Sequence, residues 1–110
     1  MVKRGDIVYL KKSAYEEESK HIQGGFRPML VVSNDVGNTH GEICLIVPLT
    51  RNQKRADFPT HAVVNGGSVA LCEQIFTINQ NSIDRKVGEV NAPDMKAIDK
   101  CLLVSLGVMI

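Results

Sequence analysis

The chain has 110 residues, a length that fits one domain built on one hydrophobic core. Apolar residues make up 44% of the sequence, which is enough to fill such a core and argues against disorder. The formal net charge is only +1, so binding to nucleic acid would require a local cluster of positive charge rather than an overall basic surface.

Apolar runs separated by turn-forming residues predict a mainly β domain. We expect strands at residues 6–10, 28–33, 43–49, 60–64, 68–71 and 73–78. A long loop is expected at 11–26, turns at 34–38 and a polar loop at 51–57. Pro48, near the end of its strand, indicates a bulge or an edge strand. Asn65-Gly66-Gly67 predicts a tight hairpin between the strands that flank it.

The end of the chain predicts a helix that runs to about Gly107. Asn91 is a suitable N-cap, and Asp94 places a carboxylate near the positive end of the helix. Apolar residues then recur at three- and four-residue spacing, at Met95, Ile98, Leu102 and Leu106. We therefore expect a single domain over residues 1–110, folded as a small curled barrel of five or six strands with a C-terminal helix.

The last nine residues, 102–110, are small or apolar except for Ser105. Such a terminal stretch is normally exposed unless something covers it. Either the barrel's own core accepts all of it, or part of the helix and tail packs against a second copy to give a homodimer. We favour the homodimer.

The cysteines and histidines, residue types that can ligate a metal, are dispersed along the chain. They are Cys44, Cys72, Cys101, His21, His40 and His61. No CxxC pair occurs, which argues against both a disulfide framework and a zinc site, so no cofactor is expected. The N-terminus lacks the apolar segment of a signal peptide, and no run approaches transmembrane length. These features predict a cytoplasmic protein that does not enter a membrane.

Arg27 is the first candidate for a functional residue. It follows Gln23-Gly24-Gly25-Phe26 and precedes Pro28, which biases its backbone toward an extended conformation at the mouth of a buried strand. A guanidinium held there suits a phosphate group, because it donates two parallel hydrogen bonds. The alternative is an exposed arginine at an ordinary strand start.

Thr50 is the second candidate, because it ends the apolar run at 43–49 beside Arg51, Lys54 and Arg55. A strand-end hydroxyl among three cations could hold a phosphate. An ordinary solvated loop is the alternative. A pair of histidines acting as general base and acid also remains open, with His61 and His40 as candidates.

These pieces occur in an order that resembles the MazF/PemK family of type II toxin endoribonucleases. The matching segments are VKRGDIVYL at 2–10, QGGFRPMLVVSNDVGN at 23–38, IVPLT at 46–50, FPTHAVV at 58–64, SVALCEQIFTI at 68–78 and the helix at 94–107. The resemblance implies an SH3-like barrel that works as a homodimer, cuts single-stranded RNA at short specific sequences without metal and is held in check by an antitoxin protein. The products implied are a cyclic phosphate and a 5′-hydroxyl.

By the same resemblance, Arg27 and Thr50 are the catalytic residues. The implied RNA-binding residues are His21, Gln23, Gly24, Gly25, Asn34, Arg51, Lys54, Glu73 and Gln74. The chain departs from the family pattern in two places: His21-Ile22 replaces the common Ser-Glu, and Phe76 replaces a frequent arginine. Other functions for such a barrel are a non-catalytic nucleic-acid or protein-binding module and a gyrase-poisoning toxin.

Overall fold

The computed structural model describes residues 1–18, 27–52 and 56–109. In these ranges the strands are β1 (Asp6–Leu10), β2 (Met29–Val31), β3 (Ile43–Thr50), β4 (His61–Val64), β5 (Ser68–Leu71), β6 (Phe76–Asn79) and β7 (Ile83–Glu89). The helices are α1 (Lys12–Glu18), α2 (Asp35–His40) and α3 (Ala92–Ser105), with a single 3₁₀ turn at Gln80–Ser82. This confirms a mainly β fold with a C-terminal helix.

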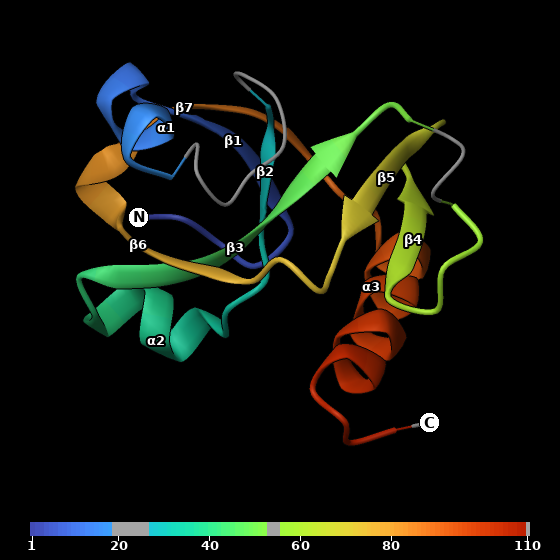
Figure 1. The fold of residues 1–110 in the computed structure, drawn as a ribbon. Helices are drawn as coiled ribbons and strands as arrows, with labels where there is room; N and C mark the ends of the chain where they lie inside the picture. The colour runs from blue at the N-terminus through green and yellow to red at the C-terminus, as the bar shows by residue number, and fades with distance from the viewer. Residues whose placement is uncertain (19–26, 53–55, 110) are drawn as a thin grey trace.

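The strands form one antiparallel sheet in the order β4-β5-β3-β2-β1-β7, and β6 pairs with the first half of β3. The sheet curls, as Figure 1 shows, so that β4 and β5 lie at an angle to β1, β2 and β7. Among the described residues no pairing joins β4 to β7, so the barrel is open.

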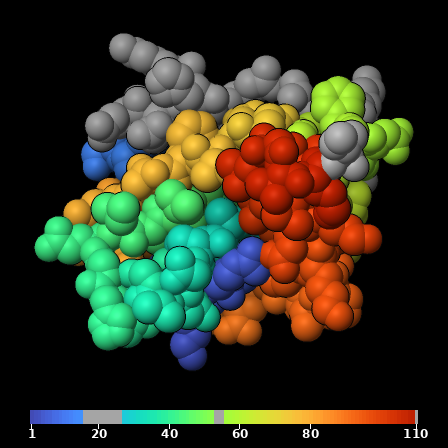
Figure 2. All heavy atoms as spheres, turned by 90° about the horizontal axis from the view of Figure 1, so that it is seen from below, coloured from blue at the N-terminus to red at the C-terminus, as the bar shows by residue number. Residues whose placement is uncertain are grey.

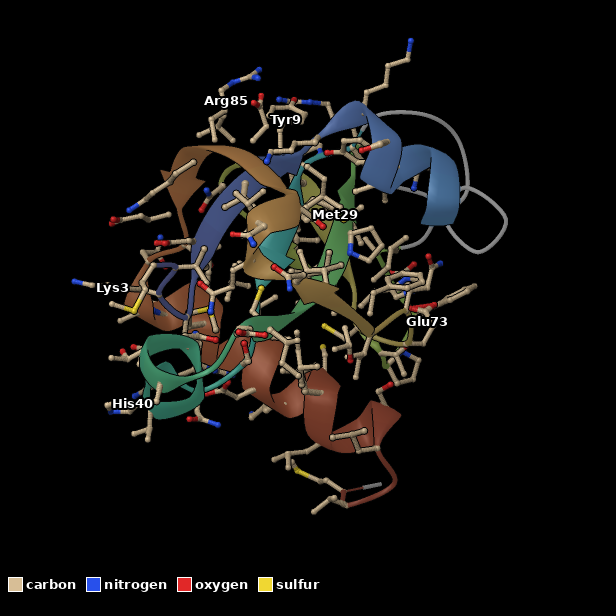
Figure 3. All side chains as sticks on the ribbon, turned by 90° about the vertical axis from the view of Figure 1, so that its left-hand side faces the viewer. Lys3, Tyr9, Met29, His40, Glu73 and Arg85 are labelled. Carbon is tan, nitrogen blue, oxygen red and sulfur yellow. The ribbon has the colours of Figure 1, made fainter. Side chains whose placement is uncertain are left out.

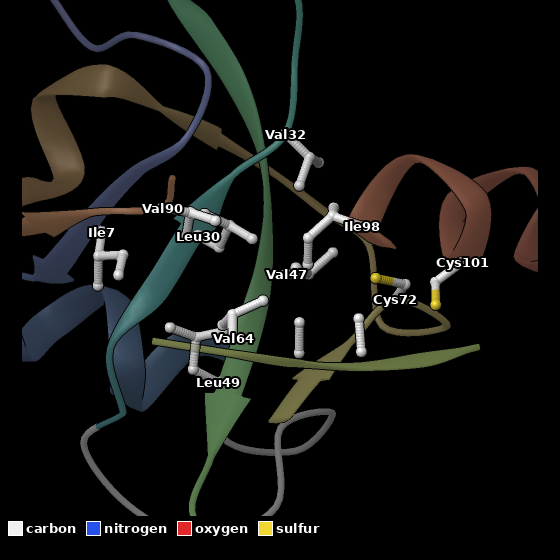
Figure 4. Packing of buried hydrophobic residues seen from close by; sticks show 12 residues of the cluster. Ile7, Leu30, Val32, Val47, Leu49, Val64, Cys72, Val90, Ile98 and Cys101 are labelled. Carbon is white, nitrogen blue, oxygen red and sulfur yellow. The ribbon is translucent and has the colours of Figure 1, made fainter. Parts of the chain in front are cut away.

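The two faces of the sheet bury separate apolar clusters. Alternation along each strand assigns neighbouring residues to opposite faces, so that Leu30 lies in one cluster while Met29 and Val31 lie in the other. The first cluster packs under α3, where Ile98 is fully buried (Figure 4). The second includes Ala14 and Tyr15 from α1.

Three elements were not expected from the sequence, and the strand predicted at 73–78 begins only at Phe76, as β6. β7 was missed, because this edge strand is mostly exposed and rich in charge and therefore lacks an apolar pattern. Residues 12–18, expected as loop, form the short helix α1. A helix of this length is marginal on its own, and burial of Tyr15 stabilises it. Turns were expected at residues 34–38, but residues 35–40 form the helix α2. Asn34 caps this helix by accepting a 2.7 Å hydrogen bond from the Gly37 amide.

Pro48 is neither on an edge strand nor exposed. It is fully buried in β3, opposite Met29 of β2. On the other side of β3, pairing with β6 ends at Ile46 and pairing with β5 begins at Leu49. Pro48 lies between these two stretches. Because proline has no amide hydrogen to donate, it fits here, where no hydrogen bond of either pairing requires one.

Helix α3 begins and ends as expected, but its apolar stripe is only partly buried. Asn91 accepts a 2.8 Å hydrogen bond from the Asp94 amide, and Gly107 adopts φ +76° beyond the last turn. Ile98 and Cys101 are buried, whereas Leu106 remains 65% exposed. The core of one chain therefore does not accept the whole apolar C-terminus. No described helix has both the length and the apolar character to cross a membrane.

The N-terminal segment ties the two covering helices to the sheet. Arg4 forms a 2.5 Å ion pair with Asp99 of α3, and its amide donates to Asp35 of α2. Its guanidinium also donates to the carbonyl of Val32. Figure 2 shows α2 and α3 on this face with the N-terminal residues between them.

Candidate active site

The pairing register brings Arg27 and Thr50 together. In the ladder between β2 and β3, Met29 lies opposite Pro48. Continuing this antiparallel register by two residues places Arg27 opposite Thr50, and the Leu49 amide donates a 3.0 Å hydrogen bond to the Pro28 carbonyl on the way. Directly opposed residues of an antiparallel pair have neighbouring side chains. The continued register therefore brings two candidates separated by 22 intervening residues next to each other.

Both residues line one pocket of about 290 Å³ at this end of the sheet. Its lining consists of Tyr9, Arg27, Pro28, Leu49, Thr50, Arg51 and Ser68. The pocket collects two guanidinium groups and three hydroxyl-bearing side chains at the mouth of buried strands, which suits an anionic ligand such as a phosphodiester. A larger hollow of about 620 Å³, lined by Met1, Gln80 and Lys86 among others, borders no predicted site residue.

The hydroxyl of Thr50 is oriented by the backbone. The Asn52 amide donates a 3.2 Å hydrogen bond to Oγ1, which fixes the side chain where β3 ends. A threonine hydroxyl has one proton to donate besides its acceptor lone pairs. Because this bond uses only a lone pair of Oγ1, the hydroxyl proton remains available to an acceptor such as a phosphoryl oxygen of a bound ligand.

The backbone of Arg27 is held by a buried phenol. Tyr15 donates a 2.5 Å hydrogen bond from its hydroxyl to the Arg27 carbonyl, and the same hydroxyl accepts a 3.0 Å hydrogen bond from the Leu10 amide. Burial raises the pKa of the Tyr15 phenol, so it keeps its proton for this bond. The guanidinium at the pocket is therefore carried by a fixed stretch of chain.

Tyr9, Ser68 and Arg85 were missed by the sequence analysis. Tyr9 and Ser68 line the pocket, and the Arg85 guanidinium lies 4.9 Å from the centre of the Tyr9 ring, a cation–π contact across β1 and β7 (Figure 3). The Asn-Gly-Gly hairpin before Ser68 could have marked it as a loop-proximal hydroxyl. Nothing in the sequence pairs Tyr9 with Arg85, because their register depends on a strand that was not recognised.

The predicted RNA-binding residues that the structure describes lie partly at the pocket and partly away from it. Arg51 lines it, but Asn34 lies past the opposite end of β2 and caps α2. Glu73 and Gln74 follow the far end of β5 from Ser68, and Figure 3 shows Glu73 well apart from Tyr9. His21, Gln23, Gly24, Gly25 and Lys54 lie outside the described residues.

His61 and Glu73 form a structural pair. The His61 side chain is 0% exposed, and its Nε2 lies 2.6 Å from a carboxylate oxygen of Glu73, which is 37% exposed. The His61 ring also stacks on Phe58 with centroids 5.0 Å apart. His40 lies on α2, and neither histidine borders the pocket, so the described residues do not support a two-histidine centre there.

The cysteines are free and buried, namely Cys44, Cys72 and Cys101. Burial raises the pKa of Cys44 to about 11 and that of Cys72 to about 12, so both remain protonated thiols. Cys72 and Cys101 belong to the apolar cluster under α3 (Figure 4). These residues act as small apolar groups of the core.

An open, curled antiparallel sheet with a C-terminal helix and a cationic pocket at one end defines a small barrel suited to a phosphodiester ligand. A sequence model of the family described as "PemK-like, MazF-like toxin of type II toxin-antitoxin system" matches residues 3–106. The chain belongs to this family.

Curated relatives agree over the whole length. The chain is 31% identical over 116 residues to "Endoribonuclease EndoA" of Bacillus subtilis (strain 168), covering 99% of this chain and 97% of the relative. It is also 31% identical over 115 residues to "Endoribonuclease MazF" of Staphylococcus saprophyticus, covering 98% and 93%.

Solved structures share the fold. One described as "Endoribonuclease in complex with its cognate antitoxin from Mycobacterial species" superposes with a TM-score of 0.78 at 24% identity, covering 98% of this chain and 97% of that chain. MazF (Form-I) of Deinococcus radiodurans superposes with a TM-score of 0.77 at 22% identity, covering 96% of each chain. These likenesses support the architecture of the open barrel.

Proposed function

We propose that this chain is a metal-independent endoribonuclease toxin that cuts single-stranded RNA, messenger RNA included, in the cytoplasm. The observation that carries the proposal is that Arg27 and Thr50 line one pocket, at the end of the paired strands β2 and β3. Family membership and two curated relatives named endoribonucleases support activity on RNA.

The reaction we propose is a transesterification within the RNA. The ribose 2′ oxygen forms a bond to phosphorus while the bond to the 5′ oxygen breaks; the 2′-hydroxyl loses a proton and the departing 5′ oxygen gains one. The products are a 2′,3′-cyclic phosphate and a 5′-hydroxyl. Negative charge builds on the phosphoryl oxygens during this step, and preorganised donors that meet it lower the barrier.

Arg27 and Thr50 supply such donors. The Arg27 guanidinium donates charge-assisted hydrogen bonds to the phosphoryl oxygens, and arginine resists deprotonation, so we assign it stabilisation of the building charge rather than the role of base. The Thr50 hydroxyl, already oriented by the Asn52 amide, orients the phosphate. Arg51 at the rim contributes attraction for the RNA backbone.

The first experiment incubates purified protein with a long RNA and with a DNA copy of it, each in excess EDTA. We expect the RNA to be cut and the DNA to stay intact, because deoxyribose lacks the 2′-hydroxyl nucleophile. RNA cleavage that EDTA abolishes, or cleavage of the DNA copy, would contradict the proposed chemistry. Intact RNA would favour a non-catalytic binding module instead.

The second experiment replaces the two candidate residues. We expect Arg27→Ala and Thr50→Val each to lower the cleavage rate by roughly two orders of magnitude, the scale of losing one transition-state donor. Thr50→Ser, which keeps the hydroxyl, is the matched control and should retain most activity. An Arg27→Ala protein that cuts RNA at the parent rate would show that the site is wrong.

An exposed apolar surface supports the proposed homodimer. At the end of α3, Leu106 is 65% exposed and Val108 is 71% exposed, although the Val108 amide is fixed by a 2.9 Å hydrogen bond to the Leu103 carbonyl. An ordered apolar surface of this kind is typical of an interface. We also propose an antitoxin protein as a partner, which is supported by the family and by the solved relative described in complex with its cognate antitoxin.

A further inference from the structure

A side-chain hydroxyl interrupts the sheet beside Arg27. In the ladder between β1 and β2, Ile7 lies opposite Leu30 and Val8 lies opposite Met29. Continuing this register by two residues places Leu10 opposite Arg27. A direct amide-to-carbonyl bond would be expected at that position of an antiparallel pair.

The structure has Tyr15 between the two strands instead. Its hydroxyl accepts from the Leu10 amide at 3.0 Å and donates to the Arg27 carbonyl at 2.5 Å. One hydrogen bond of the ladder is thus replaced by two in series, which sets Leu10 and Arg27 farther apart than a direct bond of about 2.9 Å between amide and carbonyl allows. The strands are separated at the end where Tyr9 and Arg27 line the pocket.

The Tyr15 ring is well anchored for this role. It is 5% exposed and belongs to the same apolar cluster as Val8, Leu10 and Met29. Tyr15 lies on α1, the helix that directly follows β1 in the chain (Figure 1). On the other edge of β2, the Leu49 amide bonds to the Pro28 carbonyl, so the chain at Arg27 is fixed from both neighbouring strands.

We propose that Tyr15 is a positioning residue for Arg27: its hydroxyl spaces β1 from β2 and so sets where the guanidinium meets the scissile phosphate. The proposal rests on the proposed ribonuclease function. Without the hydroxyl, β1 and β2 have two options. Either they move closer so that the Leu10 amide bonds directly to the Arg27 carbonyl, or these two groups lose the bridge between them. Both outcomes move the backbone that carries Arg27, and a displacement of about 1 Å near reacting groups is costly to the rate.

The test is Tyr15→Phe, which removes the hydroxyl and keeps the ring. With RNA cut at a mapped site, we expect the single-turnover cleavage rate to fall by about ten- to a hundredfold. Affinity for a 2′-deoxy analogue of that RNA should change by no more than about twofold, because the phosphate contacts of the ground state need less exact placement than those of the transition state. In amide hydrogen exchange, the Leu10 amide should change its protection.

Ser33→Ala is the matched control. The Ser33 hydroxyl also accepts from a strand amide, that of Leu45 at 3.0 Å, and donates to an amide oxygen, that of Asn38 at 2.5 Å. It does so at the opposite end of β2, away from the pocket. Both variants lose a bridging hydroxyl of the same kind, so a general loss of stability would affect both, whereas the cleavage rate should fall only in Tyr15→Phe.

The outcomes separate this proposal from the proposed function. Parent-like cleavage by Tyr15→Phe, with Arg27→Ala inactive, would overturn the positioning role and leave the ribonuclease intact. Parent-like cleavage by Arg27→Ala would instead overturn the site itself. If circular dichroism shows Tyr15→Phe unfolded, all variants are assayed in enough trimethylamine N-oxide to refold it, since this osmolyte favours the compact state. An equal loss of rate in refolded Tyr15→Phe and Ser33→Ala would also refute the positioning role.

Discussion

Replacing Glu73 by alanine should destabilise the protein. The change removes the carboxylate that lies 2.6 Å from Nε2 of His61, whose side chain is 0% exposed. Losing a hydrogen bond to a charged group costs about 1.5–3 kcal/mol, but Glu73 is 37% exposed, so water replaces part of the interaction. We therefore expect a loss of about 1–2 kcal/mol, which lowers the melting temperature of a domain of this size by about 4–8 °C.

Thermal unfolding followed by circular dichroism measures this effect. Glu73→Gln keeps an acceptor at the same place and should lose less stability. Asp84→Ala is a second control, because Asp84 pairs with Arg85 at the surface and should contribute no more than about 0.5 kcal/mol. A Glu73→Ala protein with the parent melting temperature and a weakened affinity for RNA would refute our reasoning and restore the RNA-binding role predicted from the sequence.

Two further predictions concern assembly and the cysteines. Light scattering at micromolar concentration should give twice the 12.1 kDa monomer mass, and Leu106→Glu should give monomers; a 12.1 kDa parent protein that still cuts RNA would contradict the dimer requirement. Native protein at pH 8 should resist thiol reagents that modify it rapidly once unfolded, because burial raises the pKa of Cys44 to about 11 and that of Cys72 to about 12. Rapid modification of the folded protein would contradict the buried placement of these thiols.

The strands that bury both faces were predictable from the sequence. Residues 43–49 form a continuous apolar run, and the structure has β3 at Ile43–Thr50, paired on both sides. The hairpin at Asn65-Gly66-Gly67 and the helix cap at Asn91 were equally readable, because each depends on a few neighbouring residues whose backbone preferences are intrinsic. The resemblance that pointed to Arg27 and Thr50 also lies in such ordered local segments.

The long-range arrangement was decided only by the tertiary structure. β7 carries mostly exposed residues, so its strand conformation follows from pairing with β1 rather than from an apolar pattern. The pairings of Tyr15 with Arg27 and of Glu73 with His61 join segments whose sequences contain no sign of each other.

Where burial imposes a periodic pattern of apolar residues, the sequence alone predicted the strands and the C-terminal helix. It also identified the family pattern that contains Arg27 and Thr50. Register, by contrast, is a property of pairs of strands: a shift of one residue would turn every side chain to the opposite face. Only the folded sheet fixes Met29 opposite Pro48, and with it Arg27 opposite Thr50 at the pocket. The residue types of the site can therefore be predicted from local sequence. Their proximity, by contrast, results from packing the whole sheet around its two buried faces.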